Sequence, residues 1–140
     1  MAAALACAGA GPAHAEQWFR LEGPELEAAN VATVEIDLDA LHPRNPGADA
    51  VIRVSLQEPK LHPGGFNYRS FIATALFDCQ RRAVSLTSAA YFSETAAAGV
   101  RLGSDSVARH GGMPDGLLDS IPASARRALL RASCAAIPAS

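Results

Sequence analysis

Residues 66–79 read FNYRSFIATALFDC, and this run decides the fold class. In an extended conformation its alternate side chains form two faces that are both apolar. A strand of this kind lies in the middle of a sheet, covered on both sides, so we expect residues 66–79 to form a central strand. One face carries Phe66, Tyr68, Ile72 and Leu76, and the other carries Phe71, Ala73, Ala75, Phe77 and Cys79.

A second apolar run follows at residues 83–92, separated from the first by the short polar stretch 80–82. Two such runs with a tight polar connection predict a long antiparallel hairpin. Shorter strands are expected on the remaining parts of the chain, because apolar and polar side chains alternate there. They are residues 17–21, 33–38, 50–56 and, as a short edge strand, 99–102, with loops at 42–47, 59–65 and 104–116.

The C-terminal segment has the spacing of an amphipathic helix. Ser120 is a suitable cap and Pro122 suits a first helical turn. The small side chains of Ala73 and Ala75 would let this helix lie close to the sheet. The apolar positions at helical spacing are Ile121, Ala125, Leu129, Leu130 and Cys134.

Residues 1–15 read MAAALACAGAGPAHA and end in two alanines at the positions that signal peptidase requires. We interpret residues 1–15 as a signal-peptide remnant and residues 16–140 as a single exported domain. One alternative is an ordinary terminus rich in small residues. Another is a lipoprotein acylated at Cys7, which the short apolar stretch before that cysteine disfavours.

Removal of Cys7 leaves Cys79 and Cys134, and an even number of cysteines in an exported domain indicates a disulfide. The alternative is two buried free thiols. A bridge would tie the helix to the central hairpin and stabilise the fold by about 4 kcal/mol in the chain-entropy model. The predicted fold class is therefore α+β: an antiparallel sheet of five or six strands, with one C-terminal helix packed on one face.

Composition and motifs exclude several classes of function. A net charge of −2 argues against nucleic-acid binding, and no segment is long and apolar enough to span a membrane. No nucleophile elbow is present. His42, His62 and His110 fall in predicted loops, without metal-ligand spacing, and are expected to be exposed. We therefore predict a non-enzymatic protein with no cofactor, metal or catalytic residue.

Two sets of residues are candidates for binding. A bridge to Cys79 would bring the polar connection of the hairpin close to the basic face of the helix, forming a patch for acidic polymers or an acidic partner. The alternative is an ordinary solvated helix face. The candidate basic patch is Arg81, Arg82, Arg126, Arg127 and Arg131. The second set is the apolar face that the helix does not cover, which predicts a curled sheet or a weak homodimer. This candidate interface is Phe66, Tyr68, Ile72 and Leu76.

The chain resembles the surface-adhesin protein E-like family of small proteobacterial secreted or surface domains. The resemblance rests on Trp18, the acidic strand 34–39, the stretch from Tyr68 through 78–82 and the segment 128–134. It departs from the family pattern at the alanine-rich stretch 95–98 and at residues 117–118. The resemblance implies a sheet-and-helix domain with a bridged C-terminal helix and, in the member that names the family, binding of host proteins.

The predicted function is an exported binding module of the bacterial cell envelope, periplasmic or at the cell surface. Its expected ligands are envelope or extracellular proteins or acidic polymers. One alternative is a structural or accessory envelope protein without an external ligand. The other is a small periplasmic enzyme or inhibitor.

Overall fold

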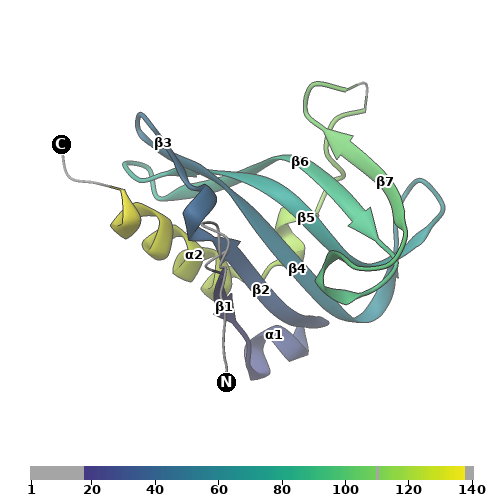
Figure 1. Ribbon diagram of the computed structural model, residues 1–140. Helices are drawn as coiled ribbons and strands as arrows, with labels where there is room; N and C mark the ends of the chain where they lie inside the picture. Colours follow the sequence, from purple (N-terminus) through teal and green to yellow (C-terminus); the bar gives the residue numbers. More distant parts are fainter. Residues whose placement is uncertain (1–17, 110, 138–140) are drawn as a thin grey trace, which may run out of the picture.

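Seven strands form one antiparallel sheet in the computed structural model, which describes residues 18–109 and 111–137 (Figure 1). Their order is β1-β2-β4-β5-β6-β7, with β3 paired to β4. The signal-peptide remnant predicted at residues 1–15 lies outside the described residues. The strands are β1 (Trp18–Leu21), β2 (Val31–Asp37), β3 (His42–Arg44), β4 (Gly47–Leu61), β5 (Asn67–Asp78), β6 (Ala83–Phe92) and β7 (Arg101–Ser106).

Strand β5 occupies the position predicted for it, between β4 and β6 in the centre of the sheet. The two largest side chains of its inner face, Phe71 and Phe77, are 0% and 2% exposed. Ala73 and Ala75 between them are also buried. The opposite face is more open, because Ile72 and Leu76 are only half-buried. The hairpin of β5 and β6 is therefore confirmed, and its inner face forms the middle of the core.

Strand β4 is much longer than the predicted segment 50–56. Its ends lie in stretches whose proline and glycine residues predict loops, but both ends pair with β5, at Gly47↔Asp78 and Leu61↔Asn67. The register of β4 against β5 shifts between Ser55 and Lys60. Pro59 lies within this irregular stretch, where proline is tolerated because no regular hydrogen bond of the sheet requires its missing N–H. Strand β7 likewise extends to Ser106, into the predicted loop 104–116, because it pairs with β6. Pairing across the sheet overrides the local turn signals at both places.

Two helices accompany the sheet. The short helix α1 (Pro24–Ala28) was not predicted, because Gly23 and Pro24 look like a strand breaker, but Pro24 opens the helix instead. The C-terminal helix α2 (Ala123–Ala136) was predicted, and it begins after Pro122. Ser120 does not cap it, because its hydroxyl donates to the carbonyl of Leu117.

Helix α2 contacts β4, β5 and β6 and so covers the inner face of the central strands (Figure 1). Its buried side chains Ala125 and Leu129 join Ile121 in the core. The disulfide between Cys79 and Cys134, with 5.9 Å between the Cα atoms, fixes the end of the helix to the end of β5. The predicted one-face packing and the predicted bridge are both confirmed.

Residues between β6 and β7 fold back onto the sheet as a short 3-10 turn, η2 (Thr95–Ala97). The hydroxyl of Ser70 donates to the carbonyl of Glu94 and accepts from the N–H of Ala97 at 2.9 Å. The hydroxyl of Ser55 accepts from the N–H of Ala96, also at 2.9 Å. Both serines are buried, so each replaces water as the partner of the turn's backbone groups.

Replacing Ser70 by alanine is expected to destabilise the domain by about 2 kcal/mol, because a buried N–H and a buried carbonyl lose their partner. Chemical unfolding followed by circular dichroism measures the change. Ser85→Ala, on the exposed part of β6, is the matched control and should leave the unfolding midpoint unchanged. Equal stability of the two variants would show that water replaces the Ser70 hydroxyl in the folded state.

Candidate functional site

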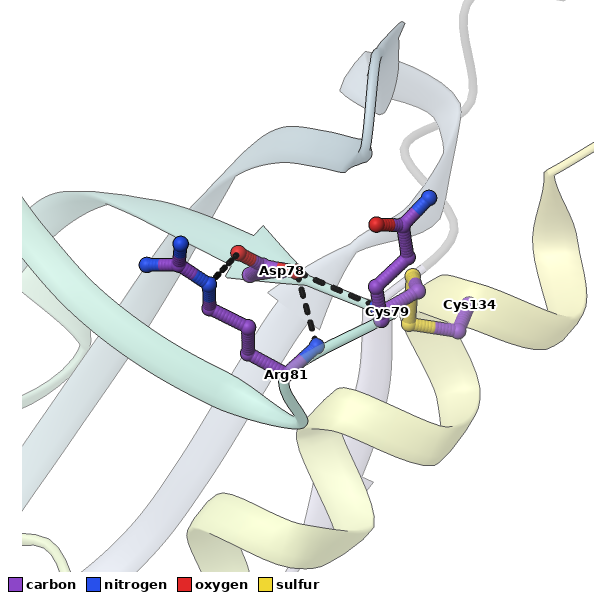
Figure 2. The surroundings of a disulfide bond; sticks show 5 residues. Asp78, Cys79, Arg81 and Cys134 are labelled. Carbon is purple, nitrogen blue, oxygen red and sulfur yellow. Dashed lines mark hydrogen bonds and ion pairs between the residues drawn. A yellow bond between two sulfur atoms is a disulfide. The ribbon is translucent and has the colours of Figure 1, made fainter.

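The end of the central hairpin and helix α2 together form the candidate site. The disulfide joins Cys79, at the start of the β5–β6 turn, to Cys134 near the end of the helix, as Figure 2 shows. The turn is shaped by Asp78, whose carboxylate accepts from the N–H groups of Gln80 at 3.1 Å and Arg81 at 2.9 Å. A short aspartate-anchored turn thus fixes the backbone that carries Arg81 and Arg82.

A groove of about 390 Å³ runs between this turn and the helix. Arg82 lines it from the turn, and Arg127 and Arg131, one helical turn apart, line it from α2. We call it the basic groove; its remaining lining is Leu130 and the Cys79–Cys134 disulfide.

A second hollow of about 300 Å³ adjoins the basic groove and extends it toward the start of α2. Three residues, Arg82, Arg127 and Leu130, line both. Arg126 also lines this second hollow. The structure therefore brings four of the five predicted patch arginines to one side of the molecule.

Arg81 lies apart from the other four. Its guanidinium is 4.0 Å from the carboxylate of Asp78, and in Figure 2 its side chain extends away from Cys134. It lines a different hollow of about 520 Å³, together with Arg44 and Leu76. Adjacent residues of the tight turn thus point to different hollows, which a sequence cannot show.

The charges of the basic groove are largely uncompensated. Arg126 is 3.7 Å from the carboxylate of Asp119. Within residues 18–109 and 111–137, the structure shows no ion pair for Arg82, Arg127 or Arg131, and all three side chains are exposed. Three clustered guanidinium groups create a local positive potential on a protein whose net charge is −2.

The four residues of the candidate interface do not form one exposed face. Tyr68 is 4% exposed and lies in the core, and Phe66 packs against the core. Only Ile72 and Leu76 lie half-buried on the outer face of β5. The sheet curls at the β4–β5 end (Figure 1), and Phe66 and Tyr68 pack near Tyr91 of β6 inside the fold.

The curl encloses an aromatic cluster that we define as His62, Phe66, Tyr68, Phe71 and Tyr91. The ring of His62 stacks on the ring of Phe66, with 4.4 Å between the ring centroids. It meets the ring of Tyr91 edge-on, with a centroid distance of 4.6 Å. The ring centroids of Tyr68 and Tyr91 are 4.8 Å apart. The tip of the β4–β5 hairpin therefore packs over β6.

A carboxylate from β7 anchors this cluster. Asp105 accepts from the hydroxyl of Tyr91 at 2.8 Å, and His62 Nε2 lies 2.7 Å from the same oxygen. The N–H of Gly64 donates to His62 Nδ1, so Nδ1 carries no proton and Nε2 donates to Asp105. Both ring nitrogens are engaged, so His62 stabilises the hairpin tip.

The prediction that His62 is exposed in the loop 59–65 is wrong, since its side chain is only 11% exposed. His42 is exposed, as expected. His110 lies outside the described residues. The described part of the chain holds no group of three or more His, Cys, Asp or Glu side chains that could bind a metal ion. Neither of its helices is long and apolar enough to cross a membrane.

Both tyrosines of the chain lie in the aromatic cluster, and burial raises the pKa of each above its usual value. For Tyr91 the hydrogen bond to Asp105 raises the pKa further. Unfolding exposes phenols that ionise at about pH 10. The two tyrosines therefore lose their protons at a lower pH in the unfolded chain than in the folded one. As a result, the free energy of unfolding is maintained below about pH 10 and falls as the pH rises beyond it.

In an alkaline titration, tyrosinate absorbance is expected to appear together with the loss of the circular dichroism signal and not before it. In the Tyr91→Phe variant, the free energy of unfolding should fall less steeply above about pH 10, because this variant lacks one of the two phenols whose pKa is raised by folding. Tyrosinate absorbance near pH 10 in a chain that keeps its full circular dichroism signal would contradict the burial of the two phenols.

The match to known proteins covers the whole of this architecture. The family model of surface-adhesin protein E matches residues 18–135, from β1 to the last turn of α2. The chain belongs to the surface-adhesin protein E family. The match confirms the resemblance inferred from Trp18, the acidic strand and the two bridged cysteines. No curated protein matches the chain.

Membership in the surface-adhesin protein E family indicates the general role of the protein. The family is one of surface adhesins, which implies a surface or exported location and binding to other molecules. The disulfide agrees with this location, because such bonds persist in oxidising compartments outside the cytoplasm.

Proposed function

We propose that this protein is an exported, non-enzymatic binding module of the bacterial cell envelope that holds anionic ligands in the basic groove. The observation that carries the proposal is the cluster formed by Arg82, Arg127 and Arg131 beside the disulfide, with no carboxylate partner among the described residues. Guanidinium groups bind carboxylate, sulfate and phosphate with paired hydrogen bonds, so a cluster of them favours such ligands.

The groove is well suited to keep its shape without a ligand. Arg82 stands on an aspartate-anchored turn, and Arg127 and Arg131 stand on a helix whose end is bound covalently to that turn. Because the backbone of the turn and the helix is already ordered, binding costs less conformational entropy than it would if these two elements had to become ordered as well. The disulfide therefore serves the site as well as the fold.

Retention on immobilised heparin tests the proposal. We expect the chain to be retained at low ionic strength and to elute as salt is raised, because exposed charges are screened within about 10 Å at 0.1 M salt. Passage straight through the column at low ionic strength would contradict anion binding. A matched column of uncharged dextran should not retain the protein.

Two other functions stay open. A structural envelope protein without an external ligand would copurify with one stoichiometric envelope partner and would not depend on the arginines of the groove. A small periplasmic enzyme or inhibitor would need convergent reactive groups. The best candidate pair in the described residues, His62 and Asp105, is held within the hairpin tip by hydrogen bonds to Gly64 and Tyr91. The geometry therefore favours the binding module.

A further inference from the structure

The basic groove has an apolar floor beneath its charged rim. Leu130 and the disulfide line it together with the three arginines, and Leu130 packs partly against the hydrophobic core. The aliphatic stems of Arg127 and Arg131 add further apolar surface below their charged ends. A ligand with charges alone would contact the rim and leave this floor exposed to water.

The shape of the groove favours an extended ligand. The groove of about 390 Å³ and the adjoining hollow of about 300 Å³ share Arg82, Arg127 and Leu130, so together they form one trough along α2. Small-molecule sites in proteins span about 300–1,000 Å³, so each of the two hollows falls in the size range of known ligand sites. A trough of this size accepts a short segment of a partner protein.

We propose that the trough binds an acidic peptide segment of a partner protein that carries one apolar side chain between carboxylates. The apolar side chain lies on Leu130 and the disulfide, and the carboxylates pair with Arg82, Arg127 and Arg131. This inference rests on the proposed function and narrows it to one class of ligand. Charge complementarity selects the acidic residues, and the apolar floor selects a peptide over a sulfated polysaccharide, which carries no protruding aliphatic side chain.

Two nine-residue peptides of equal charge test the inference on the full 140-residue chain. Acetylated and amidated EEEELEEEE should bind about fivefold more tightly than EEEEAEEEE in isothermal titration, because burying part of a leucine side chain contributes about 1 kcal/mol. The variant Arg127→Gln/Arg131→Gln should weaken both peptides equally and keep the ratio between them. A heparin hexasaccharide is the third ligand, measured under the same conditions.

The possible outcomes separate this inference from the proposed function. Equal affinity for the two peptides, or binding of the hexasaccharide with no binding of either peptide, would overturn the peptide inference and leave the anion-binding function in place. No binding of any of the three ligands would overturn both. A preference for the leucine peptide that persists at equal strength after Leu130→Asn would place the apolar contact elsewhere and overturn the inference.

Discussion

Cys79→Ser/Cys134→Ser is expected to lower the free energy of unfolding by about 3–4 kcal/mol, the largest stability change that we predict for this domain. The bridge closes a sequence separation of 55 residues, which the chain-entropy model values at about 4 kcal/mol. Domains of this size carry only about 5–15 kcal/mol in total. Calorimetry should therefore show a melting temperature about 10 °C lower or more.

Reductant provides the control for this prediction. Dithiothreitol should lower the melting temperature of the wild-type chain toward that of the double serine variant and should leave the variant itself unchanged. Serine is a mild replacement here, because both cysteines are only half-buried. A wild-type melting temperature that is the same with and without reductant would show that the end of α2 is held in place by packing alone.

Arg127→Glu/Arg131→Glu is expected to weaken binding to heparin by about 30-fold or more at low ionic strength. Each exposed ion pair contributes up to about 1 kcal/mol, and the reversed charges add repulsion to the lost attraction. The dependence of affinity on salt should also become weaker, because fewer counterions are released on binding. Both residues are exposed on α2, so the helix itself should remain folded.

Lys60→Glu/Arg101→Glu is the matched control, because it makes the same change in net charge at the other end of the strands. Lys60 pairs with Tyr68 at the start of β5, and Arg101 pairs with Phe92 at the end of β6, whereas the basic groove lies at the end of β5. This control should retain most of the heparin affinity. Equal losses in the two double variants would mean that heparin responds to net charge and not to the groove.

The central hairpin, the C-terminal helix and the disulfide could be predicted because each has a local signal. The run 66–79 is apolar on both faces, Ile121, Ala125 and Leu129 repeat at helical spacing, and the two cysteines remain as a pair once residues 1–15 are set aside. The helix and the hairpin then predict that the arginines they carry lie close together, which holds for Arg82, Arg126, Arg127 and Arg131. The strand and helix patterns depend on residues close together in the sequence, so they can be recognised without knowledge of the tertiary structure.

The aromatic cluster had no comparable signal. His62 and Phe66 lie in a stretch rich in proline and glycine, and their partners Tyr91 and Asp105 are distant in the sequence. Only the curl of the sheet brings them together.

The division of the arginines between two hollows also could not be predicted. Arg81 and Arg82 are neighbours in the sequence, but Arg82 has a left-handed backbone conformation with φ of 55°, which redirects the chain at the turn. A left-handed backbone conformation is uncommon outside glycine and asparagine, so an arginine at this position gives no signal for one. The direction of each side chain thus depends on a local feature that only the structure gives.

Mapping the ligand site by nuclear magnetic resonance tests the central claim most directly. The ¹⁵N-labelled chain is titrated with heparin hexasaccharide at low ionic strength, and shifts are followed for backbone amides and arginine Nε–H groups. We predict that the largest shifts lie at residues 79–82 and 127–134, on the two sides of the basic groove. Shifts centred on β7 and the β4–β5 tip, or no saturable shifts at all, would contradict the account.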